Sequence, residues 1–190
     1  MASSAHPSAG TDHLTSPPHA LPHHAESSAF VSAAPERGLA LVDDHERLSS
    51  HMSQSSWQMG GGHMKTILNE RRGQRVGSHI RVVGRVLGLE LSLDEMVTER
   101  EPPTRKVWVT VGSPRLLVIG PYRMGFNVTP RENGSRLRVF IDYALPGSWP
   151  ERWLGRVFGG YYARWCVQRM VDDAVRKFEA VAQPARESRH

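Results

Sequence analysis

Asp43-Asp44-His45-Glu46 is the densest run of side chains in the sequence that can bind a metal ion or move a proton. Apolar residues precede it at positions 39–42, and Leu48 follows it. This spacing predicts the junction of two short helices, with Asp44 as the cap of the second and Arg47 three residues later to balance its charge. We interpret the run as a helix joint that faces water, and we assign it no catalytic or metal role.

Other candidates for chemistry are isolated. His79 and Asp142 lie in strand-like segments in phase with arginines, so we expect both to face solvent. Cys166 is the single cysteine, which excludes an internal disulfide and a zinc site with several thiolates. We expect it to be a small buried residue and not a nucleophile. Five histidines precede the first predicted strand without regular spacing, so we expect no metal site there: His6, His13, His19, His23 and His24.

Composition and charge narrow the class of protein. The 190 residues are 39% hydrophobic and 23% charged, as in an ordinary globular domain. The net charge is +5, with 21 arginines and 3 lysines scattered along most of the chain, which favours a diffuse basic surface over a nucleic-acid site. No apolar run is long enough to cross a bilayer, and the start does not resemble a secretory signal. We therefore expect a soluble, cytoplasmic protein, and no sequence motif indicates a cofactor.

The elements follow a clear order along the chain. Residues 1–24 and 183–190 have the composition of disordered tails. Residues 26–32 can form a strand, and two short helices follow. From about 62 to 145 the apolar residues alternate with a period of two, which predicts about six strands joined by hairpins, with a break at Pro102-Pro103 and a turn at Asn133-Gly134. Residues 150–181 read as one long, bent helix, so the domain is α+β.

Four phrases at the joints of this order carry a resemblance to a known family. They occupy residues 34–52, 76–82, 97–108 and 134–143. In this order and spacing they resemble the START-like (SRPBCC) superfamily, which includes polyketide cyclases, coenzyme Q-binding proteins and the birch-pollen-allergen type. The resemblance covers about residues 25–182. Gly38 departs from the pattern, which usually has a larger apolar residue there.

The resemblance implies a helix-grip fold, in which a curved antiparallel sheet of about seven strands wraps around the long C-terminal helix and encloses an apolar cavity. Two short helices follow the first strand. Alternation then selects the strand residues that would line the cavity, and the long helix adds Tyr161, Trp165 and Met170 or Val171. The same residues would equally fill a solid core. They are Trp108, Tyr122, Met124, Phe126, Val139, Ile141, Tyr143, Tyr161, Trp165 and Met170.

The function expected from this resemblance is binding of a small hydrophobic molecule, such as a lipid, an isoprenoid or a polyketide-like aromatic. The alternative is a cyclase or aromatase acting in the same cavity, which needs a titratable side chain inside it. A third possibility is a partner-binding protein with a collapsed cavity. Aromatic residues and arginines interleave near the start of the long helix, which favours either packing over the sheet or transient contact with an anionic membrane. The oligomeric state is left open.

Overall fold

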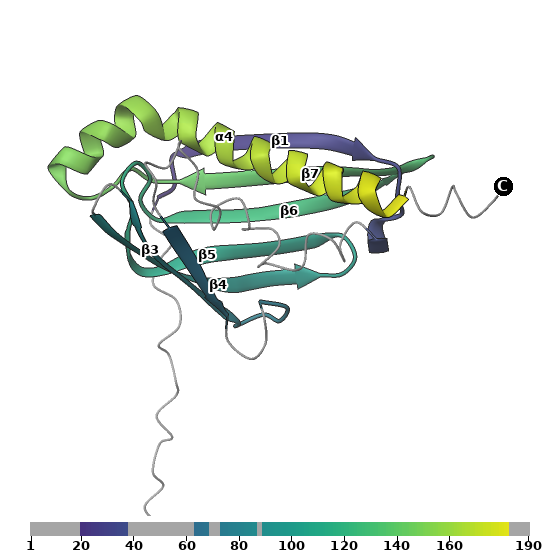
Figure 1. Ribbon diagram of the computed structural model, residues 1–190, viewed down its shortest axis with the longest axis horizontal. Helices are drawn as coiled ribbons and strands as arrows, with labels where there is room; N and C mark the ends of the chain where they lie inside the picture. Colours follow the sequence, from purple (N-terminus) through teal and green to yellow (C-terminus); the bar gives the residue numbers. More distant parts are fainter. Residues whose placement is uncertain (1–19, 38–62, 69–72, 87–88, 183–190) are drawn as a thin grey trace, which may run out of the picture.

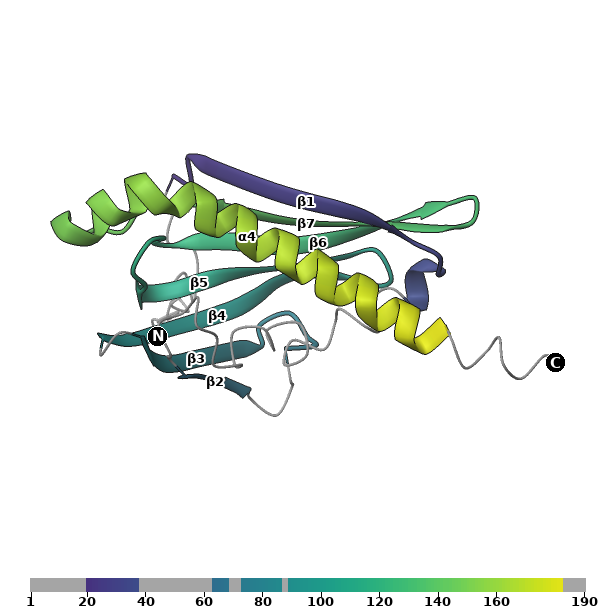
Figure 2. The same ribbon diagram turned by 45° about the horizontal axis from the view of Figure 1, so that its top comes forward.

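The computed structural model describes residues 20–37, 63–68, 73–86 and 89–182. Seven strands form one antiparallel sheet in the order β1-β7-β6-β5-β4-β3-β2. A long helix, α4, crosses one face of this sheet (Figures 1 and 2). The strands and the helix span these residues: β1 His23–Val31, β2 His63–Leu68, β3 His79–Val86, β4 Leu89–Glu101, β5 Arg105–Arg115, β6 Tyr122–Arg131, β7 Gly134–Tyr143 and α4 Trp149–Ala182.

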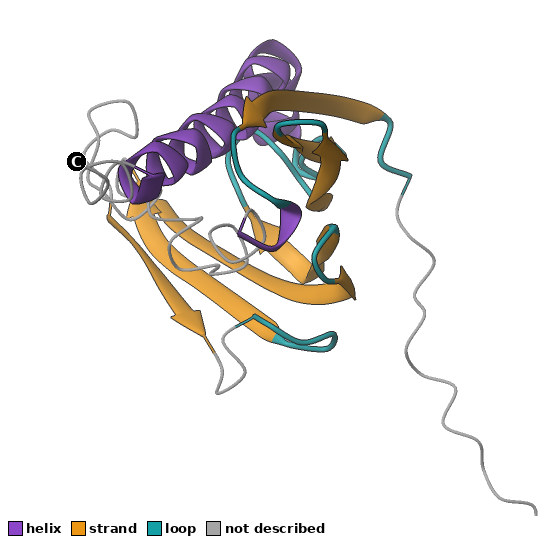
Figure 3. Cartoon of the chain, turned by 90° about the vertical axis from the view of Figure 1, so that its right-hand side faces the viewer, coloured by secondary structure: helices purple, strands orange, loops and turns teal. Residues whose placement is uncertain are grey.

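This architecture confirms the predicted helix-grip fold. The sheet is strongly curved, and α4 lies across its concave side (Figure 3). The first strand begins at His23, so His23 and His24 belong to the sheet and not to the N-terminal tail as predicted. The chain is helical at residues 35–37, where the first predicted short helix begins. The rest of the first predicted helix and all of the second, including Asp43–Glu46, fall outside the described residues.

The strand boundaries follow the turn residues found in the sequence. The break at Pro102-Pro103 falls between β4 and β5, and the peptide bond between these two prolines is cis. The predicted hairpin joins β6 to β7, with Arg131 paired to Gly134 and residues 132–133 forming the loop. Register shifts between Ser92 and Asp94 and between Val97 and Glu99 mark irregularities in β4. Such shifts change which residues share a face of the sheet.

The core lies between the concave face and α4. Strands β6 and β7 contribute alternate residues from Tyr122 to Val128 and from Leu137 to Tyr143, and these are buried in one apolar cluster. The helix adds residues spaced by three or four, which is the spacing of one buried helical face. They are Ala163, Val167, Met170, Val171, Ala174 and Phe178. Among the described helices, none is long and apolar enough to span a membrane.

Candidate functional site on the concave face

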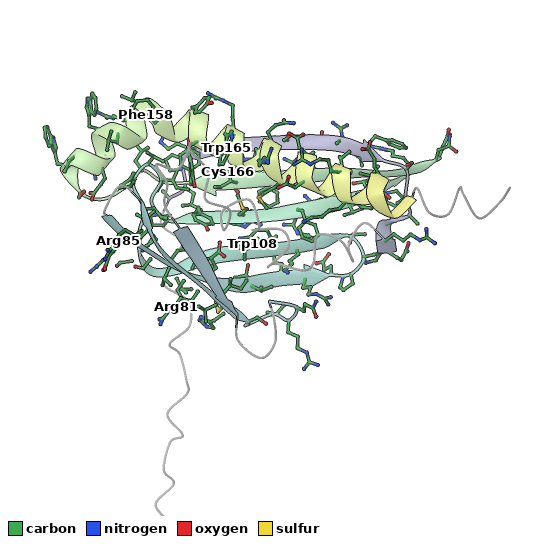
Figure 4. All side chains as sticks on the ribbon, viewed as in Figure 1. Arg81, Arg85, Trp108, Phe158, Trp165 and Cys166 are labelled. Carbon is green, nitrogen blue, oxygen red and sulfur yellow. The ribbon has the colours of Figure 1, made fainter. Side chains whose placement is uncertain are left out.

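Eight of the ten predicted lining residues are buried together on the concave face and the helix that covers it. Cross-strand pairing explains their common orientation, because directly opposed residues of antiparallel strands point to the same side. Trp108 is opposite Met124, Met124 is opposite Ile141, and Phe126 is opposite Val139. Figure 4 shows Trp108 on the strand layer and Cys166 on the helix above it. The buried group is Trp108, Tyr122, Met124, Phe126, Val139, Ile141, Tyr143 and Met170; their role in binding stays a prediction.

The other two predicted lining residues lie differently. Tyr161 is 69% exposed, so its placement in the interior was wrong. Periodicity alone does not indicate where the buried face of α4 changes direction, and Tyr161 falls on the outer side of the first turns. Trp165 is partly buried, and its ring packs against Tyr162 with 6.0 Å between centroids.

A buried carboxylate lies among these apolar side chains. Glu95 alternates in phase with Leu93 and Val97 on β4 and is only 3% exposed. The hydroxyl of Tyr122 on β6 donates a hydrogen bond to Glu95 Oε1. The backbone of Tyr122 is fixed in turn by Thr110, whose Oγ1 accepts from the Tyr122 N–H at 3.1 Å. The pair therefore joins two strands that have β5 between them.

The environment of Tyr122 keeps its hydroxyl protonated. Burial raises the pKa of Tyr122 well above its usual value, and the nearby Glu95 carboxylate raises it further. A neutral tyrosine at every physiological pH can donate to Glu95 or to a bound molecule, whereas a phenolate cannot. Tyr122 is therefore a hydrogen-bond donor in this site.

Two polar groups of α4 face the same region. Tyr162 and Cys166 are one helical turn apart and share a hydrogen bond, and both interact electrostatically with Tyr122. The proximity of Cys166 and burial raise the pKa of Tyr162 well above its usual value. Burial raises the pKa of Cys166 to about 12, so it stays a thiol at neutral pH. Cys166 is buried, as predicted for a structural residue.

Lys106 is a second charged residue on the concave face. It is 0% exposed and lies opposite Phe126, two residues from Trp108 on the same side of β5. Arg100 of β4 is opposite Lys106, because the register shift after Val97 brings it into phase. Glu95 is opposite Thr110, which lies four residues after Lys106 on β5. At the usual rise per residue of a strand, Glu95 and Lys106 are therefore about 13 Å apart along the sheet. The concave face thus has an acidic and a basic region.

Sequence reasoning missed Glu95 and Lys106 because it treated charged residues in strands as solvent-facing. The alternation itself carried the signal: Glu95 is in phase with Leu93 and Val97, and Lys106 with Trp108. Buried lysine and glutamate side chains are rare unless they are paired or functional. Both could have been identified by looking for a charged residue at a position where the alternation of the strand places a buried, apolar one.

His79 and Asp142 face outward, as predicted. The His79 side chain is about half exposed, with its Nδ1 3.3 Å from Asp94 Oδ1. Asp142 Oδ2 is 3.3 Å from Arg123 Nη1, and Asp142 Oδ1 is 2.6 Å from His24 Nδ1. Neither residue therefore supplies the inward titratable group that a catalyst in the interior needs.

The outer face of the sheet has a chain of ion pairs around one aromatic ring. Three guanidinium groups lie 5.3–6.0 Å from the ring centroid of Phe140, and each forms an ion pair with a carboxylate. Glu99 joins two of these arginines, at 2.8 Å and 3.1 Å. The three arginines are Arg105, Arg123 and Arg138. Because their charges are already compensated, we assign this network a structural role.

The described residues contain no group of three or more His, Cys, Asp or Glu side chains that could hold a metal ion. The strongest candidate from the sequence, Asp43–Glu46, is not among these residues. The site is therefore defined by an apolar wall, one carboxylate–tyrosine pair and one buried lysine.

The fold and this wall define a START-like helix-grip protein. A family model described as polyketide cyclase/dehydrase and lipid transport matches residues 22–183, and the chain belongs to this family. A comparison with curated protein sequences gave no significant match.

Solved structures with the same fold are distant in sequence. TTHA0849 from Thermus thermophilus has 16% identity and a TM-score of 0.60, over 84% of this chain and 99% of that one. Norcoclaurine synthase from Thalictrum flavum, in complex with dopamine and hydroxybenzaldehyde, has 11% identity and a TM-score of 0.57, over 85% and 87%. The di-domain ARO/CYC protein StfQ from the steffimycin biosynthetic pathway has 11% identity and a TM-score of 0.57, over 86% and 52%. At these sequence identities the similarities show a common fold and no more.

Proposed function

We propose that the protein binds a small, mainly hydrophobic molecule with a polar substituent between the sheet and α4. The observation that carries this proposal is the Glu95–Tyr122 pair within a mostly apolar wall. Small-molecule sites are mostly apolar with a few placed polar groups that fix orientation. Glu95 accepts from a hydroxyl or amine of the ligand, while the aromatic wall packs against its apolar body.

The test begins with native mass spectrometry of the protein purified from its own host, followed by extraction and identification of bound molecules. A panel of lipids, isoprenoids and aromatic polyketides is then screened for thermal stabilisation. Glu95→Gln should weaken binding of a ligand whose hydroxyl or amine reaches this residue, and Glu90→Gln, at an exposed position of β4, is the matched control. Absence of any co-purified ligand and of stabilisation by the whole panel would contradict the proposal.

A cyclase or aromatase is the second candidate, because the interior contains groups for proton transfer. An aldol cyclisation needs a base to remove a proton next to a carbonyl and an acid to protonate the carbonyl oxygen that is attacked. In this proposal Glu95 is the base, and Tyr122 or Lys106 donates to the oxygen. Two of the structural neighbours are, by name, an ARO/CYC protein and a synthase.

The enzymatic candidate is tested with a thioester analogue of a poly-β-ketone chain and product analysis by chromatography. Wild-type protein should change the ratio of cyclised products, and Glu95→Gln and Lys106→Met should abolish that change while retaining the fold. If all three proteins give the product distribution of the spontaneous reaction, the protein is a binder and not a cyclase for this substrate class.

A further inference from the structure

The first turns of α4 present a stripe of apolar side chains to solvent. Four of them recur every four residues, and we call these four the aromatic stripe: Trp149, Trp153, Val157 and Tyr161. Trp149 is 83% and Trp153 60% exposed, and Val157 is also exposed. Phe158 lies beside this aromatic stripe, on the part of the helix that projects past the ends of the strands (Figures 2 and 4).

The opposite side of the same turns explains why the stripe faces outward. A Cβ atom at Gly155 would lie 2.8 Å from the Val118 carbonyl oxygen, and one at Gly159 would lie 2.9 Å from it. The helix therefore packs on the domain through its glycines, and its large side chains are turned away. An exposed group of large apolar residues of this kind indicates an interaction surface.

Arginines accompany the aromatic stripe. Arg152, Arg156 and Arg164 are exposed, against one glutamate, Glu151, in the same turns. Nowhere in the described ranges does a carboxylate form an ion pair with any of these three arginines. In the C-terminal half of α4, by contrast, the two arginines at positions 169 and 176 both pair with Asp173. The charge beside the stripe is therefore available to an anionic partner.

We propose that this face of α4 docks on the surface of an anionic phospholipid membrane. Trp and Tyr have an apolar body and a polar tip, which suits the boundary between head groups and acyl chains. The stripe is about 18 Å long, so it can lie flat in that boundary while the arginines contact lipid phosphates. A symmetric pairing of two copies would instead bring the arginines of both stripes together, which disfavours a dimer here. The surface is separate from the concave face and does not depend on the proposed ligand.

The test measures flotation of the full chain with vesicles of phosphatidylcholine alone and of phosphatidylcholine mixed with phosphatidylserine. We expect binding to the mixed vesicles, at least tenfold weaker binding to the neutral ones, and a decrease with salt. The double variant Trp149→Ser/Trp153→Ser and the triple variant Arg152→Gln/Arg156→Gln/Arg164→Gln should each lower the partition coefficient at least tenfold. Matched controls are Phe30→Ser, an exposed aromatic on β1, and Arg81→Gln/Arg85→Gln on β3, which should bind as wild type.

Two further measurements separate the alternatives. Quenching of wild-type tryptophan fluorescence by brominated lipid should occur in the mixed vesicles, and this result does not depend on any variant folding. Light scattering after gel filtration determines whether the free protein self-associates. The proposal is overturned if wild-type protein neither floats nor is quenched, or if the control variants lose binding as much as the stripe variants do. Self-association abolished by the stripe variants, without vesicle binding, assigns the surface to a second copy.

Discussion

The hydroxyl of Tyr122 donates a hydrogen bond to Glu95 across the intervening strand β5, and both side chains are buried. A carboxylate in an apolar interior is costly unless hydrogen-bond donors compensate for the water that it has lost. The pair is thus a stability element as well as the proposed polar contact for a ligand.

Tyr122→Phe removes one donor to Glu95 and should lower the free energy of unfolding by about 1–3 kcal/mol, the range for a hydrogen bond to a charged group. Urea denaturation followed by circular dichroism measures this change. Tyr161→Phe, at an exposed tyrosine, is the control and should change stability by less than about 0.5 kcal/mol. Equal effects of the two substitutions would show that the buried hydrogen bond contributes nothing.

Gly155→Ala and Gly159→Ala should each destabilise the protein by about 1–3 kcal/mol, because the added methyl group would overlap the Val118 carbonyl oxygen and displace α4. Gly160→Ala provides the contrast. The nearest atom to its Cβ would be 3.7 Å away, and alanine favours the helix by up to about 1 kcal/mol. In thermal melts the midpoint should therefore fall for Gly155→Ala and Gly159→Ala and rise for Gly160→Ala. A shift in the same direction for all three variants would contradict this packing.

His24 should make stability depend on pH. Two hydrogen bonds raise the pKa of His24 above 6.5, the one with Asp142 more than the one with Glu26. The folded state therefore favours the protonated ring. The contribution is complete below pH 6.5 and is lost as the pH rises through the folded pKa. Since the group is exposed, we expect less than about 1 kcal/mol.

The measurement compares wild type with His24→Gln in thermal melts at pH 5.5 and pH 8.5. The wild type should be more stable than the variant at the lower pH, and the difference should shrink at the higher pH. The hydrogen bond with Arg138, and to a smaller extent that with His24, lowers the pKa of Glu26 to about 2. Glu26 therefore stays ionised throughout this pH range. A difference that does not vary with pH would rule out the protonated ring as its source.

Phe140→Leu should lower the free energy of unfolding by about 1–2 kcal/mol, because the three guanidinium groups lose the aromatic ring between them. Phe30→Leu, at an exposed phenylalanine, should change it by less than about 0.5 kcal/mol. Guanidinium is avoided as the denaturant here, since its salt would screen the network. Equal stability of Phe140→Leu and wild type in urea would exclude a contribution from these contacts.

Much of the fold could be predicted from the sequence because the strands alternate regularly. Val139, Ile141 and Tyr143 were placed on the buried face of β7 by period alone, and the structure has them there. Tyr161 could not be placed, because the packing of Gly155 and Gly159 against Val118 decides which side of α4 is buried in these turns. That contact joins segments distant in the sequence. Arg100 could not be placed either, because the register shift in β4 that turns it inward leaves no mark in the pattern.

The position of β1 in the sheet also has a consequence for synthesis of the chain. Its neighbour is β7, and Val31 pairs with Ser135, 104 residues later (135 − 31). At the usual speed of translation, β1 leaves the ribosome roughly 5–20 s before the strand that it pairs with exists. During that interval its backbone donors and acceptors can be satisfied only by water or a chaperone. The domain therefore becomes stable only when the last strand and the helix that follows it have emerged.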